Sequence, residues 1–220
     1  ESGAGINIAS GGNIALTAAT NVGTGGANGI DIQATDIAIV ALNFDIAVPT
    51  GTDLTALSVT TDLSGVVRRI AADDFSFVIS DDNTDFKLTT IIKNGGASLD
   101  FDFTATDGGI ILDNVVSRGG SVAVTSNTSF IRDQAALSKI DATGGGVTLS
   151  AATGIGSSTS SPTKLVAANL EASGGTGDVF ISNTGDLTIG GIGVTNGVST
   201  SNAEINITTS GALTATESIV

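Results

Sequence analysis

The most constraining feature of this sequence is a spacing that recurs along it. Eight positions separate Val179 from Leu187, and eight separate Ile205 from Leu213. The step from Val179 to Ile205 therefore equals the step from Leu187 to Leu213. Two other apolar pairs repeat at nearly the same step, namely Ile6 with Ile30 and Val122 with Val147. A unit of roughly 23 to 26 residues with a shorter strand spacing inside it is typical of solenoids, whose coils stack one on the next.

Short alternating runs fill these units. They are three to five residues long and alternate apolar with small polar side chains, as in residues 120–126 and 146–151. Alternation with a period of two indicates β-strands that turn one face inward and the other to water. Because the chain holds 30 glycines and many β-branched residues, its helix propensity is poor throughout. The sequence therefore predicts an all-β fold.

Small aliphatic side chains favour a parallel β-helix over a β-sandwich. A sandwich needs bulky inward residues to fill the ~10 Å between its sheets, whereas this chain has eight Phe and no Trp or Tyr. In a parallel β-helix the coils rise by ~4.8 Å, so Val, Ile, Leu and Ala can stack on their own kind in a narrow column. We expect such coils over residues 1–40 and, most regularly, over residues 105–220.

The middle of the chain, residues 41–104, departs from this pattern. Seven of the eight Phe lie between Phe44 and Phe130, and fourteen of the eighteen Asp lie between Asp31 and Asp113. This section is predicted to form either bulkier, irregular coils or a hairpin excursion from the solenoid. Because a regular aliphatic column needs no Phe, the section is also a candidate for a specific contact with a partner. The simpler alternative is that the Phe side chains fill a wider stretch of core.

Missing residue types exclude several kinds of chemistry. Cys and His are absent, so the chain has no thiol or imidazole for a structural zinc site and no Ser–His–Asp triad. Twenty-two acidic residues against eight basic ones give a net charge of −14, which disfavours nucleic acid as a partner. No run of ~18 apolar residues is available to span a bilayer. The chain begins at Glu1 in mid-pattern, so we expect a piece of a longer or processed protein.

Three glycine-rich stretches resemble the repeats of filamentous-haemagglutinin-like bacterial exoproteins. They are GGVTLSAATGIGSS at residues 145–158, ISNTGDLTIGGI at residues 181–192 and TSGALT at residues 209–214. The resemblance covers residues 105–220 well, residues 1–40 less fully and residues 41–104 poorly. It implies a right-handed parallel β-helix that is secreted to the bacterial cell surface or into an extracellular filament. This family carries no fixed catalytic residues, so the resemblance transfers none to this chain.

One acidic cluster has the composition of a calcium site. Asp81, Asp82, Asn83 and Asp85 place carboxylate and amide oxygens close together, and these are the ligands that Ca²⁺ prefers. The run lacks the glycine and the distal Glu of an EF-hand loop, so a solvated turn remains the open alternative. No other cofactor is predicted. The stretch Gly190-Gly191-Ile192-Gly193 could suggest a phosphate cradle, but no helix follows it and a corner turn is expected.

The resulting functional hypothesis is a structural shaft segment of a secreted adhesin or filament, not an enzyme. It would act by extended surface contact and self-stacking, with neighbouring copies or further repeats of the same exoprotein as partners, and host or cell-surface glycans as a further possibility. The alternative is a β-helical polysaccharide lyase or hydrolase, which would use paired acids. Four Glu and no Trp or Tyr offer little for binding and cleaving sugars, and this favours the structural hypothesis.

Overall fold

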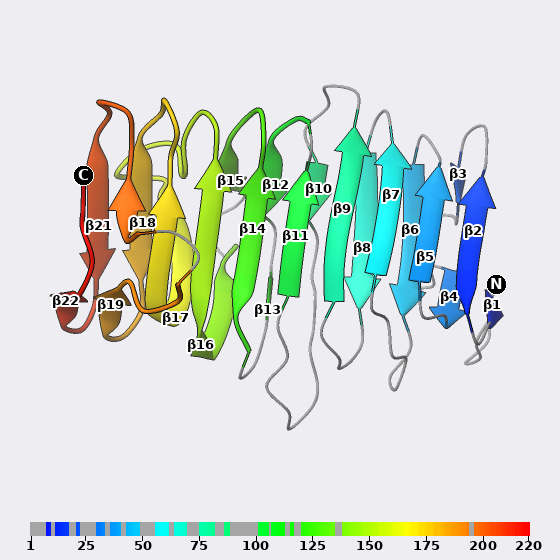
Figure 1. The fold of residues 1–220 in the computed structure, drawn as a ribbon, viewed down its shortest axis with the longest axis horizontal. Coiled ribbons are helices and arrows are strands. Elements are labelled where there is room, and N and C mark those ends of the chain that lie inside the picture. The colour runs from blue at the N-terminus through cyan, green and yellow to red at the C-terminus, as the bar shows by residue number, and fades with distance from the viewer. Residues whose placement is uncertain are drawn as a thin grey trace.

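The described part of the chain is a parallel β-solenoid. The computed structural model describes residues 8–9, 12–17, 21–22, 30–33, 36–40, 43–48, 56–61, 64–69, 75–81, 86–88, 101–105, 107–112, 115–116, 120–134, 138–193 and 196–220. Within these residues the regular elements are all β-strands, and each strand ladder is parallel, joining strands of successive coils (Figure 1). The predicted all-β, parallel β-helix fold is confirmed.

The strands fall into two long rows and a set of short connecting strands. One row contains β2 (Asn13–Thr17), β5 (Asp36–Val40), β7 (Ala56–Thr61), β9 (Phe75–Asp81), β11 (Phe101–Ala105), β14 (Val122–Ser126), β16 (Ile140–Ala151), β17 (Thr163–Ser173) and β20 (Val198–Ser199). The other contains β1 (Ile8–Ala9), β4 (Ile30–Gln33), β6 (Asn43–Val48), β8 (Ser64–Arg69), β10 (Phe86–Leu88), β12 (Ile110–Leu112), β15 (Ile131–Asp133), β18 (Val179–Asn183) and β21 (Ile205–Thr209). The short strands are β3 (Asn21–Val22), β13 (Val115–Val116), β19 (Leu187–Ile189) and β22 (Leu213–Ala215).

The first row aligns one position of every coil, and we call this column the main ladder. Each of its residues is the parallel partner of the next, and they are Ile14, Ile37, Leu57, Phe77, Phe103, Val124, Leu149, Ala172, Val198 and Ile219. In the second row, the corresponding column, called the second ladder, runs through Phe86, Ile110, Ile131, Ile155, Val179 and Ile205. Upstream in that row, β1, β4, β6 and β8 pair in parallel, and β8 lies beside β10.

The repeats found in the sequence predict the observed register. Val179 pairs with Ile205 and Leu187 with Leu213, as their equal steps along the chain require. Val122 pairs with Val147, as their repeat predicts. Coil length varies more widely than predicted, because the step from Ile37 to its partner Leu57 is shorter than the predicted unit. The ladders fix only the strand residues, so the turns between them can differ in length.

The strands of the middle section continue the stack. Within residues 41–104, β7 and β9 pair in parallel with the strands before and after them in the main row, and β6 and β8 do so in the second row. Phe75 is the partner of Phe101, and Phe77 is the partner of Phe103. Phe103 is fully buried. β9 pairs in parallel with β7 and β11, so these strands belong to the stack, and the choice between bulkier coils and an excursion stays a prediction because residues 82–85 and 89–100 lie outside the described residues.

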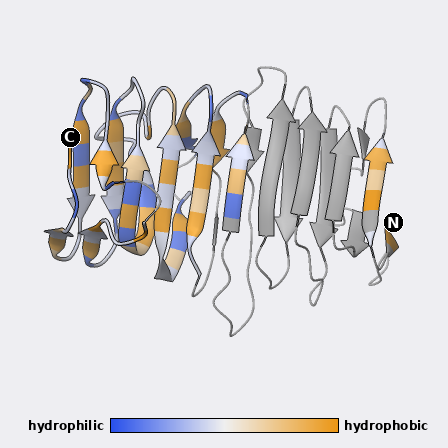
Figure 2. Cartoon of the chain, viewed as in Figure 1, coloured by the Kyte–Doolittle hydropathy of each residue, from blue (hydrophilic) through white to orange (hydrophobic). Residues whose placement is uncertain are grey.

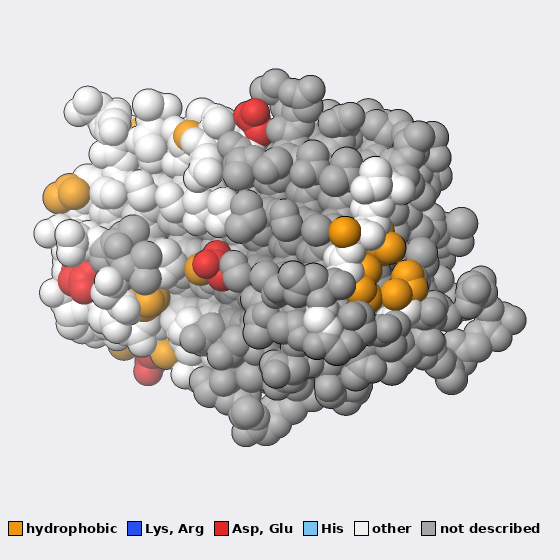
Figure 3. Space-filling model, turned by 45° about the vertical axis from the view of Figure 1, so that its right-hand side comes forward, with side chains coloured by type: hydrophobic (Ala, Val, Ile, Leu, Met, Phe, Trp, Pro, Cys, Tyr) orange, Lys and Arg blue, Asp and Glu red, His pale blue; other side chains and the backbone are white. Residues whose placement is uncertain are grey.

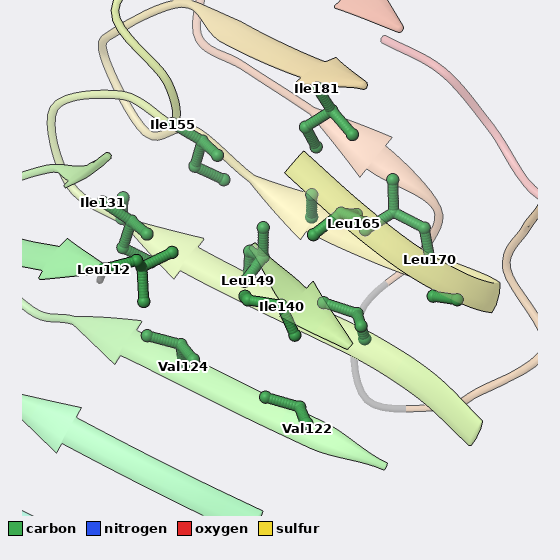
Figure 4. Close-up of a cluster of buried hydrophobic side chains, with 14 of the residues drawn as sticks. Leu112, Val122, Val124, Ile131, Ile140, Leu149, Ile155, Leu165, Leu170 and Ile181 are labelled. Atoms are coloured by element: carbon green, nitrogen blue, oxygen red, sulfur yellow. The ribbon is translucent and has the colours of Figure 1, made fainter. Parts of the chain in front are cut away.

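The core is an aliphatic column enclosed by the strands. Apolar bands alternate with polar ones along the strands (Figure 2). Figure 4 shows side chains from both rows pointing toward one another, and all ten labelled residues are buried: Leu112, Val122, Val124, Ile131, Ile140, Leu149, Ile155, Leu165, Leu170 and Ile181. Burial of such side chains stabilises the fold by about 1.5–3 kcal/mol each relative to exposure. The predicted stacking of like on like is therefore what holds adjacent coils together.

One buried position in the stack is polar. Asn183 pairs with Leu165 of the preceding coil and Thr209 of the following one, and it is almost wholly buried. Its Oδ1 accepts a hydrogen bond from the Ala167 amide at 3.0 Å, and its Nδ2 donates to the Asp186 carbonyl at 3.2 Å. Asn183 therefore satisfies two backbone groups at a corner where the strand ends.

The coils approach one another closely at their corners. A methyl group on Gly177 would overlap the carbonyl oxygen of Thr153 in the preceding coil. Gly175, at a φ of 58°, is equally close to the Ala152 carbonyl, and Thr176 donates its amide to that carbonyl at 2.9 Å. Glycine is required here because any larger residue would separate the two coils.

Candidate functional site

The predicted calcium cluster is only partly described by the structure. Asp81 is the last residue of β9, whereas Asp82, Asn83 and Asp85 lie outside the described residues. Among the residues that are described, no three acidic side chains gather closely enough to hold a metal ion. The calcium site therefore stays a prediction.

Within the described residues, an ion pair with a buried carboxylate joins two successive coils. Asp133 at the end of β15 accepts hydrogen bonds through Oδ2 from the Lys164 side chain at 3.1 Å and from the Lys164 amide at 3.2 Å. The Asp133 side chain is 6% exposed, and its Oδ1 is buried with no hydrogen-bond partner. Burial raises the pKa of Asp133 to about 6, and the contacts with Lys164 counteract this rise only in part. Asp133 and Lys164 therefore link two successive coils, and the pKa of the Asp133 carboxyl is higher than usual.

A second ion pair lies near the start of β16, in the same coil as Asp133. Asp141 accepts hydrogen bonds from the Lys139 side chain at 3.1 Å and from the Thr143 hydroxyl at 2.5 Å. Burial acts to raise the pKa of Asp141, but the hydrogen bonds from Thr143 and Lys139 outweigh it and the pKa is lowered. This pair involves residues of one coil, so it stabilises that strand rather than the contact between coils.

Between β19 and β20 the chain leaves the stack at a defined place, and we call this segment the loop of residues 190–197; residues 194–195 lie outside the described residues. Leu170 pairs with Ile189 and Ala172 pairs with Val198, so the loop is inserted opposite Glu171. Glu171 is fully buried, and its Oε1 accepts hydrogen bonds from the amides of Ile192 at 2.8 Å and Gly193 at 2.7 Å. Figure 1 shows the described residues of this loop beside β17. Its Ile192 side chain packs against Gly146, where a Cβ would clash with it.

A second glutamate holds the same loop from the next coil. Glu217 lies between Ala215 and Ile219, which stack on Ile189 and Val198, and its Oε1 accepts the Gly191 amide at 3.0 Å. Amides that could cradle a phosphate are therefore occupied by the protein's own carboxylates. The sequence indicated a turn at residues 190–193 but held no sign of these partners, because they come from the coils on either side. The one sequence feature that could have drawn attention to Glu171 and Glu217 is that Glu is rare, with four in the chain.

Small hydroxyl side chains line up on the outside of the main row. Successive parallel partners on this outward column are Thr104, Thr125, Ser150, Ser173 and Ser199, and all five are half-buried. The sequence did not reveal the column, because the offsets between its members differ from one coil to the next. Coils in such a stack rise by ~4.8 Å, so the column presents a hydroxyl group at regular short intervals.

The C-terminal coil, residues 205–220, leaves core positions uncovered. Leu187 is 1% exposed, whereas Leu213, which stacks on it, is 47% exposed. Val198 is fully buried and its partner Ile219 is 44% exposed. These side chains continue the apolar columns of the core, and the described residues place no further coil over them. The C-terminal coil therefore presents an apolar face and the backbone edges of β21 and β22.

Comparison with known proteins assigns no family and no function to this chain. No protein-family model, curated protein or solved structure matches the chain. Within the described residues, no helix has the length and apolar character needed to cross a membrane. The resemblance to filamentous-haemagglutinin-like repeats thus remains a prediction from the sequence.

Proposed function

We propose that this chain is a structural shaft segment of a secreted bacterial surface adhesin or filament. The observation that carries the proposal is the main ladder, which stays in register from Ile14 to Ile219. A stack of this kind places each coil on the one before it and so sets a fixed distance between its two ends. That is the mechanical requirement of a shaft.

Close contact between coils supports the same role. Gly177 and Gly175 bring the backbone of one coil against the carbonyl groups of the coil before it, and Asp133 and Lys164 tie two coils through side chains. Solenoid stability is the sum of such contacts between nearest neighbours, and each added coil brings further contacts. The apolar face at Leu213 and Ile219 supports stacking onto a further coil of the same kind.

The proposed partners are further repeats, neighbouring copies and glycans at a cell surface. Glycans are favoured by the column from Thr104 to Ser199, because hydroxyl groups donate and accept hydrogen bonds as sugar hydroxyls do. Contact along such a column is extended and does not depend on one deep site. The surface location rests on the sequence resemblance stated above.

Two measurements test the proposed function. Antibodies raised against this chain should label intact cells of the source bacterium, and added protease should remove the label; a signal that appears only after lysis contradicts a surface shaft. The purified chain should also leave polygalacturonate, alginate and neutral glycans uncleaved, as measured by reducing ends and by the absorbance of unsaturated products. Reproducible turnover would instead establish the alternative, a β-helical polysaccharide-active enzyme.

A further inference from the structure

One inward column of the second row holds two polar residues in succession. Asp133 is the parallel partner of Leu112 in the preceding coil, and Thr163 is the partner of Ile181 in the following coil. Asp133 and Thr163 are neighbours, because the amide that follows Thr163 donates to the Asp133 carboxylate at 3.2 Å. The column therefore runs through Leu112, Asp133, Thr163 and Ile181. Its two apolar members are fully buried and are labelled in Figure 4.

The chain leaves the stack for a short excursion at this point of the column. In the second ladder Ile155 is the partner of Ile131, so an uninterrupted strand would reach the column two residues after Ile155. The chain reaches it at Thr163 instead, because residues 157–162 form a largely exposed turn that a backbone hydrogen bond of 3.0 Å closes. The excursion thus ends by placing a hydroxyl residue, rather than an apolar one, next to Asp133.

Each of the two polar residues has a buried oxygen atom without a hydrogen-bond partner among the described residues. The atoms are Asp133 Oδ1 and Thr163 Oγ1. Thr163 is fully buried, and the Asp133 side chain is almost so. The Asp and Glu side chains visible in Figure 3 differ from Asp133, because they lie at the surface and water can reach them. Buried polar atoms in proteins bond either to other protein atoms or to ordered water.

The charges beside the two oxygens decide which ligand fits them. Asp133 Oδ2 contacts the Lys164 ammonium at 3.1 Å, so this pair is neutral overall when both groups are ionised. A metal cation at Oδ1 would leave a net positive charge in a largely buried place, which is costly. A water molecule is neutral, donates to a carboxylate oxygen, and can donate to a hydroxyl or accept from it. Successive members of a column lie ~4.8 Å apart, so one water molecule can reach both oxygens.

We propose that one buried water molecule binds between Asp133 Oδ1 and Thr163 Oγ1 and joins their two coils. It lies beside the direct contact between Asp133 and Lys164 and pairs the polar atoms that the excursion brings into the column. Buried waters of this kind are part of a protein's structure and are costly to remove. The site goes beyond the proposed shaft function and does not depend on it.

A crystal structure of the purified chain, at a resolution that places ordered water, tests the site directly. One water should lie within ~3.2 Å of both oxygens. Thr163→Val keeps the shape of the side chain without its hydroxyl and should lose this water. Thr163→Ser is the matched control, since it keeps the hydroxyl and should keep the water. Crystals grown in rubidium chloride should show no anomalous signal at the site.

Nuclear magnetic resonance tests the same water in solution. Magnetisation should pass from water to the Thr163 methyl group and to the Lys164 amide of the parent chain. The Ala167 amide is the matched control, because it donates to the buried Asn183 side chain, and it should receive none. These measurements use the parent chain, so they decide the matter if Thr163→Val fails to fold.

Three results would overturn the proposal. The first is a direct hydrogen bond between the Asp133 carboxyl and the Thr163 hydroxyl with no water between them. The second is a rubidium signal at the site, which would make the ligand a cation. The third is the absence of magnetisation transfer to Thr163 and Lys164. The shaft function would stand in each case, because it rests on the register of the main ladder.

Discussion

Leu213 stacks in register on Leu187, yet one is nearly half exposed and the other is buried. The two leucines belong to successive coils and occupy the same position in the column. What differs is that Leu187 has a coil on each side and Leu213 has one. In this solenoid an apolar side chain is buried by its two neighbouring coils, so its energetic value depends on its place in the stack.

Truncating these two leucines should therefore have unequal effects. Leu187→Ala is expected to lower the free energy of unfolding by about 3 kcal/mol, because it leaves a cavity in the column. Leu213→Ala should cost less than about 1 kcal/mol in the monomer, because much of that side chain already contacts water. Urea unfolding followed by circular dichroism measures both, at a concentration where the chain is monomeric. Equal losses would contradict the idea that burial requires a coil on each side.

Removing the Glu171 carboxylate should release the loop of residues 190–197. Glu171→Ala leaves the amides of Ile192 and Gly193 without their acceptor, at an expected cost of roughly 3 kcal/mol. Glu171→Gln keeps an acceptor oxygen and should cost less. Hydrogen exchange read out by mass spectrometry should show faster exchange at residues 190–197 in the Ala variant. Glu204→Ala, which alters an exposed side chain, is the matched control and should leave that exchange unchanged.

The stability of the chain should rise as the solution becomes mildly acidic, through Asp133. Its pKa is raised from 3.8 to about 6 in the folded state, so the folded chain binds a proton more tightly than the unfolded chain does. Between about pH 7.5 and about pH 5 this adds on the order of 1 kcal/mol to the free energy of unfolding. Asp133→Asn, which can still accept the Lys164 amide, should remove that contribution.

The control for this pH dependence is Asp141→Asn. The pKa of Asp141 is lowered, so its contribution is lost only as the pH falls below its unfolded value of 3.8. The difference in stability between about pH 5 and about pH 7.5 should therefore be the same in Asp141→Asn as in the parent chain. If Asp133→Asn keeps the full pH dependence, another group is responsible for it.

Adding one methyl group at a corner should separate two coils. Gly177→Ala is expected to cost about 3 kcal/mol or more, because the new Cβ overlaps the Thr153 carbonyl and the backbone must shift. Gly12→Ala meets nothing within contact distance and should be neutral or slightly stabilising. Thermal unfolding compares the two variants directly. A Gly177→Ala chain as stable as the parent would show that the corner can open without loss.

Deleting one whole coil should leave a folded, shorter stack. Removing residues 179–204 brings Ile205 to the place of Val179, so that it stacks on Ile155 in the second ladder. Removing residues 179–191 deletes half as much chain but breaks the register, and it should disrupt the coils that follow. Circular dichroism and limited proteolysis distinguish the two. Greater damage from the longer deletion would contradict the independence of coils that a shaft requires.

Much of the fold could be predicted from the sequence where coils have similar lengths. One shared step along the chain predicts both the Val179–Ile205 and the Leu187–Leu213 pairs, because strand alternation and like-on-like stacking leave little choice of register. Coils that differ in length, such as the shorter one between Ile37 and Leu57, carry no such repeat. Their register depends on tertiary contacts that no local pattern encodes.

The candidate site was harder to predict, because its members come from separate coils. Glu171 and Glu217 meet the loop of residues 190–197 only after the coils have stacked, and neither stands in a motif with it. The hydroxyl column has the same origin. Asp133 lies two positions after the buried Ile131, but its contact with Lys164 spans 31 residues and depends on the turn between them. The predicted calcium residues remain to be tested, since only Asp81 lies within the described residues.

Asn183 bears on how such a chain folds without error. In a column of interchangeable Val, Ile and Leu, a strand that docks one coil too early or too late would bury nearly the same apolar area. Such a misregistered chain would be a long-lived kinetic trap. Asn183 meets the Ala167 amide of the preceding coil only in the native order of coils, whereas its contact with the Asp186 carbonyl lies within its own coil. A shift would leave the Asn183 side-chain oxygen and the Ala167 amide unpaired, at about 1–3 kcal/mol each. The Asn183 amide therefore destabilises a chain whose coils have assembled in the wrong order.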